Sequence, residues 1–316
     1  MGEVVAVETS DKDLIDDFVT DSQIRGLTEG TIQSYLSPIN IFKDFIHQHG
    51  TSLPDADGND LKRYIQHLRE KDRSQKTIEN HFSALSSFYD YLSYDGIIPG
   101  NPVTDVRKRY LRRYKKQASK SQRKLVTIEE MSMFLNAIID PRDKALCTLL
   151  AKTGRGRKEV SLIDIGDIDW DTMSITMKPT AKRTNRLVYF DGECARILRK
   201  WLQRRDEIAA SNESALFVGY TKGKRLQRSG IYNNFIHWAT KVGLHDPDSD
   251  KLEDHFTPHC CRHWFTTMLL RAGMRREHVK ELRGDARSEA IDIYHHIDRE
   301  DLRKQYLACI PQLGLE

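Results

Sequence analysis

The stretch "TPHCCRHWFTTMLLRAG", residues 257–273, places two histidines, two cysteines and an arginine at the start of an apolar segment. Its apolar residues keep the spacing of a helix. Thr257 is placed to cap this helix and Pro258 to begin it, because proline is tolerated at the first helical position. His259 and Arg262 then share one face of the helix. The residues of the opposite, apolar face are Cys261, Trp264, Phe265, Met268 and Leu269.

The histidines and cysteines of this segment look like half of a zinc site, but their spacing argues against one. Cys260 and Cys261 are adjacent, so on a regular helix their side chains point about 100° apart and cannot bind one ion together. No second Cys or His pair stands at zinc-finger spacing elsewhere. His259 beside Arg262 instead joins a proton-transfer group to a guanidinium suited to phosphate. We therefore expect neither a metal nor another cofactor.

The composition is typical of a globular protein found inside cells. Hydrophobic residues make up 39 % of the 316 residues and charged residues 30 %, a balance unlike that of a disordered chain. No apolar run reaches the length of a membrane span, and the acidic N-terminal segment lacks the apolar core of a signal peptide. The five cysteines are odd in number and irregularly spaced, which favours reduced thiols. We expect a cytoplasmic protein of two domains.

A basic run divides the sequence. Residues 107–124 read "RKRYLRRYKKQASKSQRK", with ten Lys or Arg in eighteen positions and no Asp or Glu. Such a run is either a solvated charged segment or a segment that lies along a phosphate backbone, where its cations would give salt-dependent binding. We interpret it as a basic linker whose cations would bind a polyanion. The cations expected to do so are Arg109, Arg112, Arg113, Lys115 and Lys116.

The patterns on the two sides of this linker predict two mainly α domains. Residues 10–106 contain four helical patterns, of which the second, at 27–50, should kink or break at Pro38. The last part of this N-terminal region, residues 97–106, has the prolines and glycine of an irregular exit loop. Residues 125–316 are mostly helical too. Two stretches with the strand period, 169–179 and 185–193, surround a turn at 180–184 and predict a small antiparallel sheet.

Residues 257–298 resemble the C-terminal signature of tyrosine recombinases, the phage integrase and Xer group. That signature is a His-x-x-Arg helix, a turn similar to Glu-Leu-Leu-Gly-His, and a tyrosine about ten residues beyond it. "LLAKTGRGRKEVSLIDIGDIDW", residues 149–170, is similar to the family's first catalytic box. Residues 27–46 and 77–106 are similar to its N-terminal DNA clamp. This resemblance implies a two-domain C-clamp, with a SAM-like core-binding helical domain at 10–106 and a catalytic domain at 125–316.

The resemblance also implies roles for individual residues. Tyr294 would attack a DNA phosphodiester to form a 3′-phosphotyrosine, which a 5′-hydroxyl of a second strand reverses without a cofactor. Arg262 would clamp the phosphate, and His259 would donate or accept a proton there. Lys182, in the hairpin turn, would protonate the leaving 5′-oxygen. Glu159 would support the site. The hairpin register leaves Arg183 or Lys178 as alternatives for the lysine.

Two positions depart from the family pattern. Asp285 stands where most members have the His or Trp of the Leu-Gly-His turn, and an ionised aspartate can only accept hydrogen bonds. Gly156 stands where the frame Thr-Gly-x-Arg-x-x-Glu has its first catalytic arginine. Arg155 and Arg157 flank it, each about 100° away if the segment is helical. Either one reaches the phosphate, or the chain is strongly impaired in strand cleavage.

We therefore expect a site-specific DNA recombinase or integrase of the kind carried by mobile genetic elements, impaired by Gly156. The alternative is a cleavage-deficient DNA-binding protein on a recombinase fold, which Gly156 and Asp285 favour. A helical regulator without phosphate chemistry would leave the ordered boxes unexplained. The expected partner is double-stranded DNA, with no membrane and unknown accessory proteins. The free protein should be a monomer and the DNA-bound form a homotetramer. In the family the segment after the nucleophile packs onto a neighbouring protomer. Here the apolar series of residues 299–316 would pack onto a neighbour or onto its own domain; it consists of Leu302, Tyr306, Leu307, Ile310 and Leu313.

Overall fold

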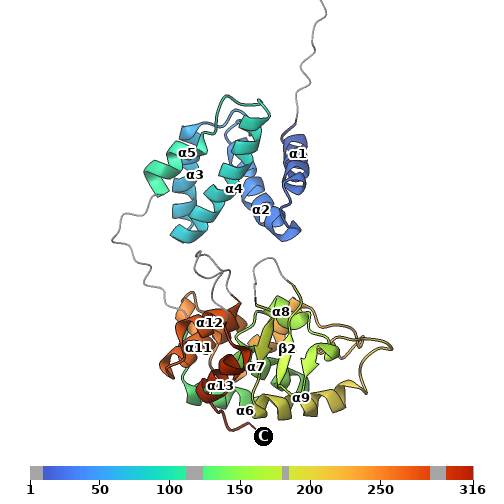
Figure 1. Cartoon of the computed structure of the whole chain (residues 1–316). Coiled ribbons are helices and arrows are strands. Elements are labelled where there is room, and N and C mark those ends of the chain that lie inside the picture. Colours follow the sequence, from blue (N-terminus) through green and yellow to red (C-terminus); the bar gives the residue numbers. More distant parts are fainter. Residues whose placement is uncertain (1–9, 112–123, 180–184, 285–296, 316) are drawn as a thin grey trace, which may run out of the picture. The chain divides into compact units, whose positions relative to one another are not determined.

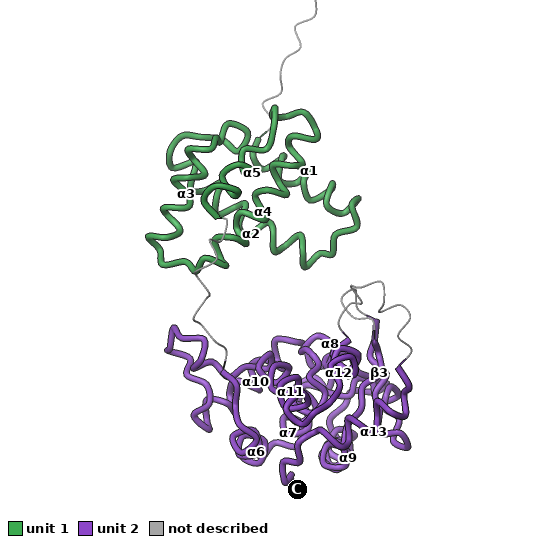
Figure 2. The backbone as a smooth tube through the Cα atoms, turned by 60° about the vertical axis from the view of Figure 1, so that its left-hand side comes forward, with its two compact units in different colours: residues 1–118 green, residues 119–316 purple. Residues whose placement is uncertain are grey.

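The computed structural model describes residues 10–111, 124–179, 185–284 and 297–315. Most of them are helical. The chain forms two compact units, residues 1–118 and 119–316, which Figures 1 and 2 show separately. Of the predicted DNA-binding cations, Arg109 is described and is exposed, while Arg112, Arg113, Lys115 and Lys116 lie outside the described residues. No helix among the described residues is both long and apolar enough to cross a membrane.

The first unit is all-helical, and side-chain caps begin its four long helices. The hydroxyls of Ser10, Thr28 and Ser74 and the carboxylate of Asp57 each accept a hydrogen bond from a backbone N–H of the first turn, which would otherwise be unsatisfied. The helices are α1 (Asp11–Ile24), α2 (Glu29–His47), α3 (Gly58–Glu70) and α4 (Gln75–Tyr94). They enclose an aromatic core that includes Phe18, Phe42, Tyr64, Phe82 and Phe88.

Two details of this unit differ from the sequence prediction. The predicted break at Pro38 does not occur, and α2 is one element, because Ile39 and Phe42 beyond the proline belong to the same core against which Tyr35 and Leu36 before it pack. The predicted exit loop also ends in helix. Asn101 Oδ1 accepts a hydrogen bond from Val103 N at 2.8 Å. This hydrogen bond holds the first residue of α5 (Val103–Val106), whose N-cap position is Pro102, and a π-helical turn, η1 (Arg107–Leu111), follows it.

The second unit is built around α7 (Pro141–Thr153), which is buried from Ala145 to its end and packs against α9, α10 and α11. Three short strands, β1 (Ile168–Asp169), β2 (Ser174–Thr176) and β3 (Leu187–Tyr189), form an antiparallel sheet in that order. The remaining α-helices are α6 (Ile128–Ala137), α8 (Arg157–Ser161), α9 (Gly192–Arg205), α10 (Arg228–Lys241), α11 (Pro258–Arg271), α12 (Arg276–Arg283) and α13 (Arg299–Cys309), and η2 (Ile165–Asp167) and η3 (Leu252–Asp254) are 3₁₀ turns.

The last described residues pack onto their own unit. Leu302 and Tyr306 of α13 are fully buried, and Ile310, Leu313 and Leu315 after it are at most 3 % exposed. Glu193 of α9 accepts hydrogen bonds from the backbone N–H groups of Leu313 and Leu315. The apolar series expected to pack onto a neighbouring protomer is therefore covered within the single chain. Of the two arrangements considered, the structure describes docking onto the chain's own domain.

Candidate active site

The helix α11 presents the two polar residues that the sequence singled out. Thr257 occupies the N-cap position, although its side chain makes no capping hydrogen bond, and Pro258 is the first residue of the helix, as predicted. The predicted apolar face is buried throughout. His259 is exposed, and its ring lies 4.8 Å from that of His263. Arg262 is buried and donates from Nη1 to the Gly154 carbonyl at 3.1 Å and from Nη2 to the Arg283 carbonyl at 3.0 Å. The guanidinium thus joins the ends of α7 and α12.

The cysteines of α11 point elsewhere. Cys261 is enclosed in the core, where burial raises the pKa of its thiol well above the usual value. The Cys260 sulfur lies 3.4 Å from the His255 carbonyl oxygen. Across the described ranges, no three His, Cys, Asp or Glu side chains gather in a way that could hold a metal ion.

The turn between α7 and α8 departs from helical geometry at two glycines. Gly154 ends α7 in the left-handed conformation, with φ 61°. A Cβ atom there would lie 2.5 Å from Phe265 Cδ1, so the contact with α11 also requires glycine. Gly156 is extended, with φ −82° and ψ 159°, and is the N-cap of α8. Its backbone N–H donates to Glu159 Oε2 at 3.0 Å.

Arg155, between these glycines, is 1 % exposed. Its Nη1 donates to Glu159 Oε1 at 3.0 Å, and its Nη2 donates to the Asn185 carbonyl at 3.3 Å. The guanidinium also lies against Gly284, where a Cβ atom would be 2.8 Å from Nη1. Glu159 therefore orients Arg155 and caps α8 with the same carboxylate. Because residues 154–156 are not helical, the Arg155 side chain is free of the 100° offset that a helix would impose.

Arg157 has a different environment. It is half-buried, its guanidinium lies 4.8 Å from the centre of the Tyr232 ring, and its Nη1 lies 3.5 Å from the Arg228 carbonyl. A guanidinium over an aromatic face is held by a cation–π interaction. Arg157 is therefore fixed by α10, whereas Arg155 is fixed by the carboxylate of its own turn.

These residues surround one cavity of about 560 Å³. Five of its eight lining residues are Lys or Arg, one is His259, and none is Asp or Glu. A concave surface lined by charges of one sign concentrates the opposite charge. The cavity is therefore suited to a phosphate group. Its lining consists of Arg155, Gly156, Arg157, Lys158, Arg228, Pro258, His259 and Arg262.

Four predicted site residues, Tyr294, Lys182, Arg183 and Asp285, lie outside the described residues. The described residues next to these segments in the chain contact Arg155, one of the arginines that line the cavity. Asn185 follows the segment 180–184 directly, Gly284 precedes the segment 285–296 directly, and both are in contact with Arg155.

Lys178, the alternative for the hairpin lysine, is held by two carboxylates. Its Nζ lies 2.8 Å from Asp167 Oδ1 and 3.0 Å from Asp164 Oδ2. Hydrogen bonds to Asp167 and Asp164 raise the pKa of Lys178. Burial raises the pKa of Asp164, but hydrogen bonds from Arg225, Lys178 and Ser214 outweigh it and hold that pKa at about 2. A lysine paired in this way releases a proton less readily, so Lys178 is poorly suited to be a general acid.

Sequence reasoning missed three residues of this region. Asn185 and Arg228 belong to no motif. Tertiary packing brings them beside Arg155 and Arg157, so the sequence gives no local signal for them. Gly284 belongs to the turn similar to Leu-Gly-His, and its positive φ of 63° is the signal that a glycine in such a turn provides.

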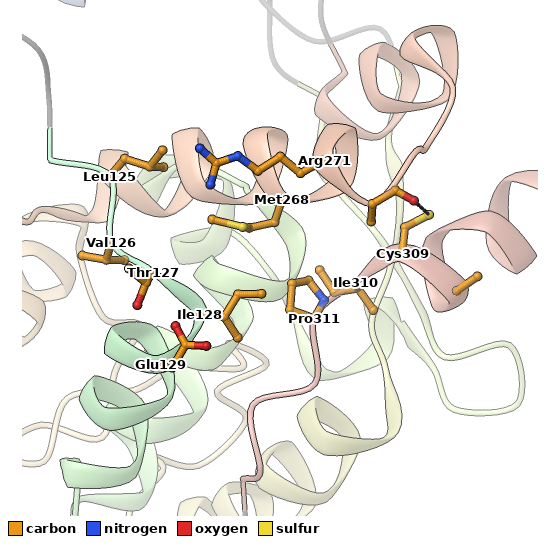
Figure 3. Close-up of a pocket in the computed structure, with 12 residues that line it drawn as sticks. Leu125, Val126, Thr127, Ile128, Glu129, Met268, Arg271, Cys309, Ile310 and Pro311 are labelled. Carbon is orange, nitrogen blue, oxygen red and sulfur yellow. Dashed lines mark hydrogen bonds between the residues drawn. The ribbon is translucent and has the colours of Figure 1, made fainter.

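A larger cavity, of about 730 Å³, lies between the start of α6, α11 and the end of α13. Figure 3 shows the apolar side chains of Met268, Ile310 and Pro311 facing this space, with Arg271 at its edge. It brings together neither paired acids and bases nor several cations. The smaller, basic cavity is therefore the candidate active site.

Comparison with known proteins identifies the family. Residues 124–301, more than half of the chain, match the model of the Phage integrase family, and residues 14–98 match the model "Phage integrase, N-terminal SAM-like domain". The chain belongs to the phage integrase family. The resemblance stated from the sequence is thereby confirmed, as is the mainly α fold with a SAM-like domain before a catalytic domain.

Integrase relatives cover nearly all of the chain. It is 29 % identical over 285 residues to the tyrosine recombinase XerC of Herpetosiphon aurantiacus, covering 87 % of each protein. It is 27 % identical to XerC of Oceanobacillus iheyensis, covering 94 % of this chain and 96 % of that protein.

Two solved integrase structures share the fold. The Tn1549 transposon integrase in complex with circular intermediate DNA has a TM-score of 0.65 at 17 % identity, covering 92 % of this chain and 98 % of that one. A lambda integrase dimer bound to a COC′ core site also has a TM-score of 0.65, at 15 % identity, covering 91 % and 98 %. At these identities the likeness concerns the fold alone. Membership of the family supports DNA strand transfer by a tyrosine recombinase.

Proposed function

We propose that this integrase is a site-specific recombinase that breaks and rejoins double-stranded DNA through a 3′-phosphotyrosine at Tyr294. The observation that supports this most is the basic cavity in which Arg155, Arg262 and His259 meet. Tyr294 Oη loses its proton and forms a bond to phosphorus, the bond from phosphorus to the 5′-oxygen breaks, and that oxygen gains a proton to leave as a hydroxyl. Since one phosphoester replaces another, a 5′-hydroxyl can reverse the step without a cofactor. The cations stabilise the additional negative charge of the phosphorane.

We further propose that Arg155 acts in place of the arginine missing at Gly156. Its burial, its 3.0 Å hydrogen bond to Glu159 and its position with Arg262 on one cavity support this role. Arg157 is less suited because Tyr232 holds its guanidinium. The impairment expected from Gly156 remains a prediction, and it would leave a cleavage-deficient DNA-binding protein. The geometry of Arg155 favours the active enzyme.

The test is a nicked suicide substrate, on which a cleaving recombinase accumulates a covalent protein–DNA adduct. We expect an adduct with the wild-type chain and none with Tyr294→Phe. Tyr220→Phe is the matched control, because Tyr220 is 42 % exposed, donates its hydroxyl to Asp140 and does not line the basic cavity. DNA binding without any adduct from the wild-type chain would support the cleavage-deficient alternative.

We also propose that the protein is a monomer when free and a homotetramer on DNA, with both units in contact with the duplex. Solved relatives are described as dimers and tetramers bound to core sites or to a Holliday junction, which supports this assembly. Sedimentation of the free protein and of its complex with paired sites would measure both states.

A further inference from the structure

Asn185 is the buried junction between the hairpin and three other elements. It is 5 % exposed. Its Nδ2 donates to the Leu187 carbonyl at 2.7 Å and to the Glu281 carbonyl at 2.9 Å. Its Oδ1 accepts from Leu187 N at 3.1 Å and from Arg299 Nη1 at 3.2 Å. The side chain thus uses both donors and both lone pairs of its carbonyl oxygen, so its orientation is fully determined.

The chain that enters segment 285–296 is held at this junction. Asn185 Nδ2 donates to the Glu281 carbonyl, which also accepts from Gly284 N at 2.9 Å, and Arg262 Nη2 donates to the Arg283 carbonyl. Two of the last carbonyls of α12 are therefore bound by side chains from other elements. Gly284 follows with φ 63°, and its backbone packs so closely that a Cβ atom would be 2.9 Å from the Asn185 carbonyl oxygen.

The chain that leaves segment 285–296 is held at the same place. Asp298 caps α13 by accepting a hydrogen bond from Asp301 N at 2.8 Å. Arg299 Nη1, in the first turn of α13, lies 3.2 Å from Asn185 Oδ1 and 3.2 Å from Glu281 Oε1. The Arg299 carbonyl accepts a hydrogen bond from Tyr189 Oη at 3.0 Å. The chain before segment 285–296 and the chain after it are therefore both held by contacts with Asn185 and Glu281.

We propose that Asn185, with Arg299 and Glu281, is a positioning network for strand cleavage. It holds Arg155 through the Asn185 carbonyl and fixes both chain ends that flank the twelve residues 285–296. This rests on the proposed function, because it requires Tyr294 in that segment to be the nucleophile. Fixing the ends lowers the entropy cost of bringing the segment to the arginines. A displacement of the order of 1 Å in a reacting group can lower a rate about 100-fold.

The experiment measures single-turnover cleavage of a nicked suicide substrate at saturating protein, together with half-site affinity. We expect Asn185→Ala and Arg299→Ala each to slow cleavage about 10- to 100-fold, while the Kd for the half-site changes by less than about 2-fold. The double variant should be slowed by less than the product of the two effects, because both act on one network. Lys304→Ala is the matched control, since Lys304 lies on the same helix with its side chain 71 % exposed.

A second substrate distinguishes loss of this network from an indirect effect on Lys182, which lies three residues before Asn185. A 5′-bridging phosphorothiolate leaves as a thiol, whose low pKa makes a general acid unnecessary. We expect Asn185→Ala to be slowed equally on this substrate, because Tyr294 and Arg155 are still misplaced. Restored cleavage of the phosphorothiolate would overturn the proposal and assign the defect to Lys182.

The outcomes also separate this proposal from the one on which it rests. Failure of the wild-type chain to form an adduct would overturn both. Normal cleavage by Asn185→Ala and Arg299→Ala, beside an active wild-type chain, would overturn the positioning network alone. Should Asn185→Ala fail to fold, Arg299→Ala decides, because the Arg299 side chain is 52 % exposed and its loss leaves no cavity.

Discussion

Arg155 and Arg262 line one basic cavity, although only Arg262 stands where the family pattern has an arginine. Removing a preorganised donor from a developing oxyanion typically lowers the rate about 10²–10³-fold. We expect this loss for Arg155→Ala, measured as single-turnover cleavage of the suicide substrate. Gly156→Arg should change the rate little, because the phosphate already has two guanidinium groups.

The opposite results for Arg155→Ala and Gly156→Arg would support the prediction that Gly156 impairs strand cleavage. If Gly156→Arg raises the adduct yield by orders of magnitude and Arg155→Ala leaves it unchanged, the position of the first arginine is vacant. Arg157→Ala is the comparison variant: Arg157 also flanks Gly156 and lines the same cavity, but Tyr232 holds its guanidinium, so its loss should slow cleavage less than the loss of Arg155. Tyr294→Phe supplies the blank.

Gly284 tests how closely the backbone must approach Arg155. Alanine there would have a left-handed φ of 63° and a Cβ atom 2.8 Å from Arg155 Nη1. The conformation alone costs about 1–2 kcal/mol, and the contact would displace the guanidinium. We expect Gly284→Ala to slow cleavage. Gly243→Ala is the control, since Gly243 has φ 73° but no neighbouring atom within 4 Å, so it should cost stability and leave cleavage unchanged.

Single residues were predictable where their roles depend on local geometry. The N-cap position of Thr257 and the shared face of His259 and Arg262 follow from helical spacing, and the structure contains both. The position of Arg155 was not predictable, because it depends on the extended backbone of Gly156 and on Glu159 and Asn185 across the turn. No spacing rule describes a side chain whose direction is set by a non-helical turn.

Among the elements, helix starts followed from the sequence and helix continuations did not. The start of α11 at Thr257 and Pro258 could be read locally, because the preferences at a helix start act within four residues. Whether α2 continues through Pro38 depends on the core that both halves share, and whether 103–111 is helical depends on Val103 and Leu111 being buried. Those are tertiary effects, which local patterns do not contain.

The burial of residues 310–315, which follow α13, leads to a prediction about stability. Leu313 is 2 % exposed, its carbonyl accepts from Ser132 Oγ at 2.6 Å, and its N–H donates to Glu193. We expect Leu313→Ala to lower the free energy of unfolding by about 2–5 kcal/mol, the usual cost of truncating a buried leucine. Urea denaturation measures it. Leu270→Ala is the control, because Leu270 is 42 % exposed on α11. Equal midpoints for the two variants would contradict the docking onto this unit.

At the scale of the whole molecule, the charge run between the two units makes a prediction about DNA binding. Replacing Arg112, Arg113, Lys115 and Lys116 by Gln should weaken binding about equally for all sequences. It should also flatten the plot of log K against log salt by about one unit for each phosphate that the variant no longer neutralises. Fluorescence anisotropy over a salt series measures both quantities.

The control for the linker variant removes positive charge from another surface. Lys200 and Arg204 are exposed on α9, which lies on the side of its unit away from α8 (Figures 1 and 2). Replacing them by Gln should leave the slope unchanged. An unchanged slope for the linker variant would exclude residues 112–116 from the DNA contact.

The division into two units was predictable because the composition changes sharply at the basic run 107–124. The docking of residues 310–315 was not, since an apolar series fits its own unit and a neighbour equally well.

The packing of residues 310–315 also bears on how the protein is made. Lys152 of α7 is fully buried, and its ammonium donates to Asp191, to Glu193 and to the carbonyl of Pro311. The centre of the second unit thus obtains one of its partners from a residue 159 positions further along the chain. The first unit needs nothing beyond residue 118 and can fold while the ribosome is still translating. The second unit completes its core only after residue 315 has left the exit tunnel, so it should fold after the first unit.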